Sequence, residues 1–205
     1  RGKMMTARFK PCKLHGRVDA PPSKSMAHRY LCGAALSGQK CTLTGIDFSE
    51  DILASIDCLR ALGAEIVTDN DTVTVNPTEF MKAESPVLNC RESGSTLRFF
   101  IPLALCLGKN LTFKGSDRLF ERPLDVYEEL CREKGFTFIK EKGALTVCGR
   151  LESGAFRLRG DVSSQFITAL HFALPLVGGS SLEVTGNLES KPYITMTQQA
   201  MSLFG

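Results

Sequence analysis

The chain repeats itself about every 70 residues. Three segments align with one another: "SKSMAHRYLCGAALSGQKCTLTG", "ESGSTLRFFIPLALCLGKNLTFKG" and "VSSQFITALHFALPLVGGSSLEVTG". Each has a serine-rich entry, an apolar run of helical length, a glycine turn, and a short strand-like run that ends on glycine. The closing glycines, Gly45, Gly115 and Gly186, are 70 and 71 residues apart. Self-similarity at a fixed period indicates one folding unit used several times, which strongly limits the possible architectures.

A second helix-like segment follows each of these runs: "SEDILASIDCLRALG", "FERPLDVYEELCREKG" and "ESKPYITMTQQAMSLFG". These segments end at Gly63, Gly135 and Gly205, because glycine suits the left-handed residue that closes a helix. Pro123 and Pro192 are expected in the first turns of the second and third segments. The sequence therefore predicts two helices in each unit.

Two β-hairpins are predicted after the first two of these helices. "AEIVTDNDTVTVN" alternates around Asn70 and Asp71, and "FTFIKEKGALTVCG" alternates around Lys142 and Gly143. Alternation on both sides of such turn residues is typical of a hairpin.

The predicted fold class is α/β, built from a strand–helix–strand–helix–hairpin unit. The repeats cover residues about 21–90, 91–160 and 161–205. The chain stops where the third hairpin is expected, so we expect the third repeat to be incomplete.

The composition excludes several classes of protein. A hydrophobic content of 43% supports a real core, and a net charge of only +3, without a basic run, argues against nucleic acid as a partner. No apolar stretch reaches the length of a membrane span, and residues 1–20 lack the apolar centre of a signal peptide. We therefore expect a cytoplasmic protein that does not contact a membrane.

The eight cysteines contain no C-x-x-C pair, and none of the three histidines has ligand spacing to a cysteine. We expect free cysteines used as small core residues in a reducing compartment, and neither a metal nor a cofactor.

The first helix entry, "PPSKSMAHR", has the features of an anion site. Proline and serine suit a helix start, so Lys24 and Ser25 stand where free N–H groups and the helix dipole attract anions. Arg29 follows Ser25 by one turn on the same side. The alternative is a capped surface helix with an incidental cation.

The repeat strengthens the anion interpretation. Related copies would bring three helix entries together, and the residues at these entries are Ser25, then Gly94 with Ser95, then Ser163 with Ser164. Three arginines are expected nearby: Arg29, Arg98 and Arg122. Such a site suits a phosphorylated, carboxylated small molecule. The alternative is that glycine and serine only cap three packed helices.

Five motifs in order, "PPSKSMAHR", "SGSTLR", "ERPL", "GDVSSQF" and "SKPY", resemble the 5-enolpyruvylshikimate-3-phosphate synthases of the enolpyruvyl transferase family. The resemblance covers about Lys13 to Gly205. It implies transfer of the enolpyruvyl group from phosphoenolpyruvate to the 5-hydroxyl of shikimate 3-phosphate, with release of phosphate. That reaction belongs to the shikimate pathway, which leads to chorismate and the aromatic amino acids.

The resemblance also implies an organisation. The family has two domains of three units each, with the active site between them. Residues 21–205 resemble the first, substrate-binding domain, and residues 1–20 resemble a strand that packs with the second domain. The acid–base residues of that second domain have no counterparts in this sequence, so the resemblance implies a missing domain and an inactive fragment.

The resemblance assigns substrate contacts residue by residue. Lys24 would touch both substrates, and with Arg122 it would be catalytic. Contacts with shikimate 3-phosphate would come from Lys24, Ser25, Arg29, Ser163, Ser164, Gln165, Ser190 and Tyr193. Contacts with phosphoenolpyruvate would come from Lys24, Gly94 and Arg122.

One stretch departs from the family pattern. Many members have Asn-Ala-Gly-Thr-Ala where this chain has Glu92 to Thr96, with Gly94 retained. The resemblance therefore leaves the detail of the phosphoenolpyruvate pocket, and with it inhibitor sensitivity, open.

Other functions stay open at this point. One is a transferase acting on a nucleotide-linked amino sugar, which would have Asn in place of Ser25 and a cysteine in "GSDRLFERP". Another is a non-catalytic phosphosugar-binding module. A third is an RNA-end-processing enzyme, which would need a catalytic histidine, whereas His28 and His171 are expected to be packed or surface residues. The acids Glu50 and Asp51 are expected to complement a helix dipole.

Overall fold

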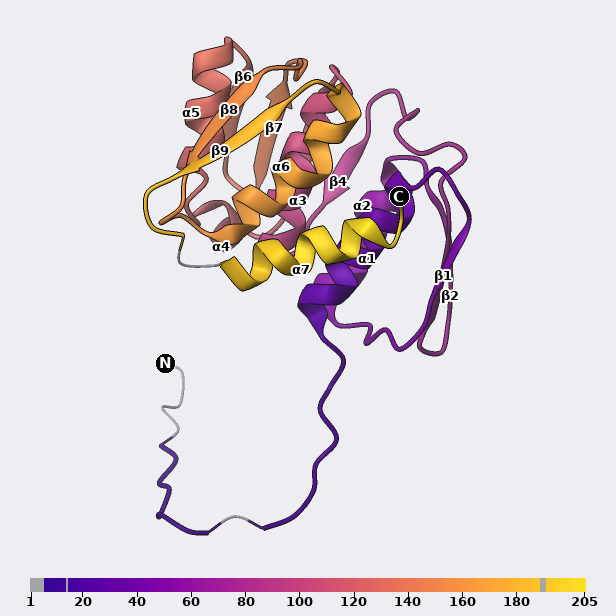
Figure 1. Ribbon diagram of the computed structural model, residues 1–205, viewed down its shortest axis with the longest axis vertical. Coiled ribbons are helices and arrows are strands. Elements are labelled where there is room, and N and C mark those ends of the chain that lie inside the picture. Colours follow the sequence, from indigo (N-terminus) through magenta and orange to yellow (C-terminus); the bar gives the residue numbers. More distant parts are fainter. Residues whose placement is uncertain (1–5, 14, 189–190) are drawn as a thin grey trace.

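The computed structural model describes residues 6–13, 15–188 and 191–205 and has the predicted mixed α/β character (Figure 1). The first group of elements is α1 (Lys24–Leu36), β1 (Cys41–Leu43), α2 (Glu50–Ala61), β2 (Glu65–Asp69) and β3 (Thr72–Asn76). The second is β4 (Val87–Asn89), α3 (Gly94–Cys106), β5 (Asn110–Lys114), α4 (Asp117–Phe120), α5 (Asp125–Lys134), β6 (Thr137–Glu141) and β7 (Ala144–Cys148). The third is β8 (Ala155–Arg159), α6 (Ser164–Val177), β9 (Ser181–Thr185) and α7 (Lys191–Ser202).

The strands form three small sheets, ordered β1-β3-β2, β4-β5-β7-β6 and β8-β9. The pairs β4–β5 and β8–β9 are parallel, and the other pairs are antiparallel. Both predicted hairpins are confirmed: β2 and β3 flank Asn70 and Asp71, and β6 and β7 flank Lys142 and Gly143. Figure 1 shows β1 and β2 beside α1 and α2, with β6 to β9 gathered near α5 at the opposite end.

The core lies between the sheets and a connected set of helices. α3 packs along α6, α6 packs on α7, and α7 packs on α1. Alternate residues of the hairpin strands, such as Val73 and Val75 in β3, are buried, as expected of a sheet with one face on the core. The large buried rings of α3 and α6 are Phe99, Phe100, Phe166 and Phe172. Apolar burial of this kind supplies the main driving force for folding.

Pro102 lies inside α3, and a residue from another helix compensates for it. Proline has no N–H, so it cannot donate to the carbonyl four residues earlier, which belongs to Arg98. The Tyr127 hydroxyl from α5 donates to that carbonyl at 2.7 Å. Tyr127 is fully buried, and its ring meets Phe166 edge-on at 4.9 Å. The defect in α3 therefore ties α5 to the core.

The helix boundaries follow the capping signals with one exception. Ser23, Ser93 and Ser163 are the N-caps of α1, α3 and α6, and their hydroxyls accept from backbone N–H groups. The expectation that Pro123 lies in the first turn of its helix is wrong. α5 begins after it, and α4 is a separate turn before it, because the residue before a proline is disfavoured in helical geometry.

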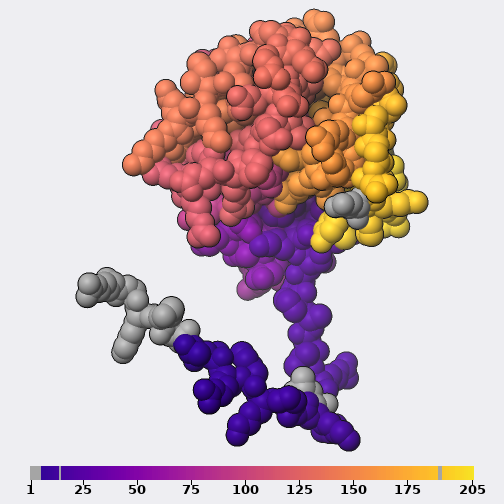
Figure 2. Space-filling model, turned by 90° about the vertical axis from the view of Figure 1, so that its left-hand side faces the viewer, coloured from indigo at the N-terminus to yellow at the C-terminus, as the bar shows by residue number. Residues whose placement is uncertain are grey.

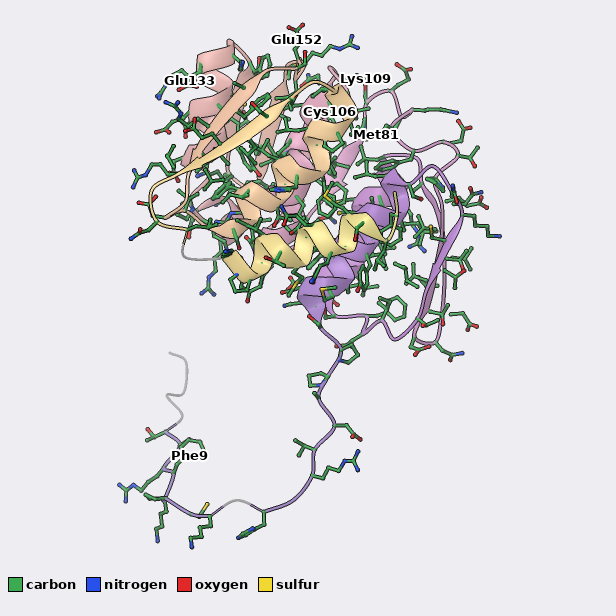
Figure 3. All side chains as sticks on the ribbon, viewed as in Figure 1. Phe9, Met81, Cys106, Lys109, Glu133 and Glu152 are labelled. Carbon is green, nitrogen blue, oxygen red and sulfur yellow. The ribbon has the colours of Figure 1, made fainter. Side chains whose placement is uncertain are left out.

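The expected strand within residues 1–20 is not formed in the described part of that segment. Residues 6–13 and 15–23 are irregular and exposed, and the segment extends away from the body (Figure 2). Phe9 is 90% exposed on it (Figure 3). A strand needs a neighbouring strand for its hydrogen bonds, and the described part of the chain places none beside residues 6–13 and 15–20. The pairing of this segment with a second domain stays a prediction.

The cysteines are free, as predicted, and Cys32, Cys58, Cys90 and Cys131 are buried. None of the helices in the described part of the chain has the length and hydropathy needed to cross a membrane.

Candidate functional site

A cavity of about 300 Å³ lies where the N-termini of α1, α3 and α6 meet the start of α7. It is lined by Ser25, His28, Arg29, Ser95, Phe99, Ser163, Ser164, Gln165 and Tyr193. The structure therefore brings together most of the side chains expected to hold shikimate 3-phosphate. Ser190, also expected there, lies outside the described residues.

The serines stand in this cavity because they begin helices. Ser163 is the N-cap of α6 and Ser164 its first residue, while Ser25 and Ser95 are the second residues of α1 and α3. The first N–H groups of a helix have no partner within that helix, so they are available to a negatively charged group. Three such helix starts share one cavity.

Gln165 connects the α6 and α3 sides of the cavity. Its Nε2 donates to Ser95 Oγ at 2.8 Å, and its Oε1 accepts from Arg98 Nη1 at 2.7 Å. Arg98 also donates from Nη2 to the carbonyl of Pro123 at 3.0 Å. Because both ends of the Gln165 amide are used, its orientation at the cavity wall is fixed.

Arg29 is buried, with an exposed fraction of 2%, and it holds three helices together. Its Nε donates to Thr197 Oγ1 of α7 at 2.9 Å, and its Nη2 donates to Thr168 Oγ1 of α6 at 3.1 Å. Within α1, its Nη1 donates to the carbonyl of Ser25 at 2.7 Å. Arg29 therefore shapes the cavity as well as charging it, since much of its donor capacity is used within the protein.

The cavity has an excess of positive charge. Burial lowers the pKa values of Arg29 in the cavity wall and of Arg98, which bonds to Gln165, but an arginine side chain keeps its charge in a protein. Among the described residues neither guanidinium pairs with a carboxylate; the acceptors are hydroxyl, amide and carbonyl oxygens. Arg91 offers the contrast, because Asp57 and Glu50 hold it outside the cavity. An anionic ligand would supply the missing countercharge.

Lys24 lies apart from this cavity. Its side chain is 54% exposed and forms an ion pair with Asp51 from the start of α2. It lines a separate depression with Ser23 and Asp47. The structure thus gives Asp51 a charged partner in addition to the predicted dipole role, and it places Lys24 outside the cavity that Ser25 and Arg29 line.

The two residues expected to meet phosphoenolpyruvate lie together. Gly94 is buried at the start of α3, and the Arg122 guanidinium lies against it. The exposed Arg122 comes from the turn between α4 and α5. The structure therefore forms two groups, one around Arg29 and one around Gly94.

Three residues of the cavity wall, Ser95, Phe99 and His28, are not among the predicted substrate contacts. Ser95 is predicted only as part of a helix entry of the anion site, Phe99 lies in an apolar run, and His28 is predicted to be a packed or surface residue. The available signal was the helical period, because Ser25 and His28 are three apart and Ser95 and Phe99 are four apart.

A larger cavity, of about 590 Å³, lies between α5 and the β8–β9 sheet. Its walls carry both acids, such as Glu129 and Glu133, and bases, such as Arg157. It contains none of the predicted site residues, and its mixed charge does not select an anion. Size alone does not make it the better candidate.

Comparison with known proteins agrees with the sequence motifs. Residues 9–205 match the family model of EPSP synthase (3-phosphoshikimate 1-carboxyvinyltransferase). A 3-phosphoshikimate 1-carboxyvinyltransferase of Clostridium kluyveri is 46% identical over 198 residues, which cover 95% of this chain and 46% of the relative. One of Clostridium perfringens is 41% identical over 199 residues, covering 95% and 47%.

A solved structure of EPSP synthase from Acinetobacter baumannii has a similar fold. It superposes with a TM-score of 0.73 at 20% identity, covering 90% of this chain and 42% of that one. The chain spans about half the length of the curated relatives it matches. By the family model, which covers nearly all of it, the chain belongs to the EPSP synthase (3-phosphoshikimate 1-carboxyvinyltransferase) family.

Proposed function

We propose that this chain forms the shikimate 3-phosphate-binding half of an enzyme that transfers the enolpyruvyl group of phosphoenolpyruvate to the 5-hydroxyl of shikimate 3-phosphate, releasing phosphate. The observation that carries the proposal is the cavity in which three helix N-termini meet the buried guanidinium group of Arg29, which has no carboxylate partner among the described residues. The relatives named 3-phosphoshikimate 1-carboxyvinyltransferase support it.

The phosphate of shikimate 3-phosphate binds at the helix starts. Ser25, Ser163 and Ser164 donate hydrogen bonds from hydroxyl or backbone N–H groups, and Arg29 supplies positive charge from the cavity wall. Gln165 and the half-exposed ring of Tyr193 contact the cyclohexene ring. Ser190 is a further phosphate ligand in this proposal.

Phosphoenolpyruvate binds on the Gly94 side. Arg122 pairs with its anionic groups, and the missing side chain of Gly94 leaves room for it. Lys24 touches both substrates once its ion pair with Asp51 opens, and it then stabilises the charge that develops during transfer.

The reaction needs more than these residues. The 5-hydroxyl oxygen attacks C2 of phosphoenolpyruvate and loses its proton, while the methylene carbon gains a proton and becomes a methyl group. Phosphate then leaves the tetrahedral adduct as the methyl group gives up a proton, which restores the carbon–carbon double bond of the enolpyruvyl product. We propose that a second domain, as in the relatives of twice this length, supplies the base, and that the 205-residue chain alone is inactive. The three groups of elements are then repeats of one unit, and residues 1–20 pair with that domain.

The proposed setting is the cytoplasm, where free cysteines such as those of this chain persist. The partners are then the two small-molecule substrates and the second domain.

Phosphate release from shikimate 3-phosphate and phosphoenolpyruvate tests the proposal. The chain alone should stay at the background rate, and mixing it with the C-terminal half of the Clostridium kluyveri relative should restore turnover. Turnover by the chain alone would refute the proposal that a second domain supplies the base. Ligand binding without turnover in the mixture would favour the phosphosugar-binding module instead.

A further inference from the structure

His28 is a polar side chain of the cavity wall that the proposed mechanism does not use. It is 2% exposed, on α1 between Ala27 and Arg29. Its Nδ1 lies 2.8 Å from Ser55 Oγ of α2. Its Nε2 is buried and has no hydrogen-bond partner among the residues that the structure describes. A buried polar atom without a partner costs stability unless something else satisfies it.

A chain of hydroxyl groups continues from Ser55 to the start of α3. Ser55 Oγ lies 2.8 Å from Thr96 Oγ1, and Thr96 Oγ1 donates to Ser93 Oγ at 2.7 Å. Ser93 Oγ in turn accepts from the Thr96 backbone N–H, as the N-cap of α3. All three hydroxyl residues are buried.

The direction of the hydrogen bonds along this row of hydroxyl groups determines which ring nitrogen of His28 carries the proton. A hydroxyl has one proton to donate. Thr96 donates its proton to Ser93 Oγ or to the Asp51 carbonyl oxygen at 3.3 Å, and in both cases it accepts from Ser55. Ser55 has then used its own proton and must accept from His28 Nδ1. The Nδ1–H tautomer follows, and Nε2 is left with a lone pair.

The charge state agrees with this assignment. Burial, opposed by Asp51 and supported by Lys24 and Arg29, lowers the pKa of His28 to about 4, so the ring is neutral at neutral pH. A neutral ring with Nδ1–H is a hydrogen-bond acceptor at Nε2. The cavity already offers several donors, from serine hydroxyls, the Gln165 amide and Arg29. An acceptor beside these donors is suited to a ligand O–H group rather than to a second anion.

We propose that Nε2 of His28 accepts a hydrogen bond from a hydroxyl group of the ligand, and so makes the site specific for a hydroxylated ring. The inference rests on the proposed function, because the ring hydroxyls are those of shikimate 3-phosphate. Through Ser55 and Thr96 the same bond is continuous with the N-cap of α3, beside Gly94.

Binding measurements on the 205-residue chain test the role of His28. Titration calorimetry should use shikimate 3-phosphate and its analogues that each lack one ring hydroxyl. The wild-type chain should bind one analogue about tenfold more weakly than the parent, as expected for a lost hydrogen bond. His28→Asn, whose amide can still donate to Ser55 but has no atom at Nε2, should bind that analogue and the parent equally. His171→Asn, on α6 outside the cavity, is the matched control and should keep the tenfold difference.

His28→Asn that keeps the full discrimination against every analogue would overturn the proposal. A second measurement does not depend on the ligand. The ¹⁵N NMR spectrum of the histidine-labelled chain should show His28 protonated at Nδ1 and unprotonated at Nε2, and a protonated Nε2 would overturn it as well. A wild-type chain that binds none of the compounds would refute the proposed function, and the NMR spectrum would still decide the assignment of His28.

Discussion

Arg122 lies directly against Gly94: a Cβ atom added to Gly94 would come within 2.6 Å of Arg122 Nη1. No real Cβ tolerates that distance, so any side chain at this position must push the guanidinium away. The backbone of Gly94 is helical, as the first residue of α3, and lies outside the left-handed region. A side chain at this position would therefore disturb the contact with Arg122 and not the backbone turn.

Gly94→Ala should displace Arg122 and weaken the binding of phosphoenolpyruvate. With the C-terminal half of a relative added, we expect the KM for phosphoenolpyruvate to rise about tenfold or more, with little change for shikimate 3-phosphate. The Tm should hold or rise, because alanine favours a helix over glycine. Gly154→Ala is the control, since its added Cβ meets nothing within 4 Å. A lower Tm with both KM values unchanged would contradict this account.

Tyr127→Phe should destabilise the chain by about 1–3 kcal/mol, because it leaves the Arg98 carbonyl buried without a donor. Urea unfolding measures this loss. The cost should be smaller in a Pro102→Ala background, where the restored N–H can donate to the same carbonyl. Equal costs in the two backgrounds would show that the hydroxyl does not compensate for the proline.

Acid should destabilise the protein through His28. The unfolded side chain titrates near 6.5 and the folded one near 4, so between these pH values the unfolded state alone binds the proton. The free energy of unfolding should fall by about 3 kcal/mol from pH 6.5 to pH 4 on this account. The pH dependence should be flatter in His28→Asn and unchanged in His15→Asn, on the exposed N-terminal segment. If the free energy of unfolding had the same pH dependence in the wild type and in His28→Asn, the role of His28 in acid destabilisation would be refuted.

Arg29→Lys should lower both stability and affinity, because an ammonium group cannot reproduce the planar set of bonds to Thr197 and Thr168. We expect a loss of about 1–3 kcal/mol in unfolding free energy, and roughly ten- to a hundredfold weaker binding of shikimate 3-phosphate. Arg132→Lys, exposed on α5, should change neither. If Arg29→Lys bound shikimate 3-phosphate with full affinity, the role of Arg29 would be only structural.

Local signals in the sequence predicted the elements well. The serine caps, the turn at Asn70 and the stop of α5 at Gly135 are short-range chemistry, and they hold in the structure. The break at Pro123 was missed because two competing signals, a helix entry and a restricted preceding residue, occur at the same place.

The site was only partly predictable because its contacts are long-range. Arg29 bonds to Thr197, 168 residues away, and Gln165 bonds to Ser95, 70 residues away. The 70-residue repeat suggested that the helix entries meet, but it did not show which groups accept hydrogen bonds from Arg29. Nor did it show that Lys24 pairs with Asp51 outside the cavity.

The most direct test of the account compares shikimate 3-phosphate with shikimate in titration calorimetry on the 205-residue chain, alongside Gln165→Glu. The account predicts measurable binding of shikimate 3-phosphate and at least about tenfold weaker binding of shikimate, because the helix N-termini and the buried Arg29 stabilise the phosphate charge. Gln165→Glu places a carboxylate beside Ser95 and Arg98 and should abolish most of that preference. Equal affinity of the wild-type chain for the two compounds would contradict the account.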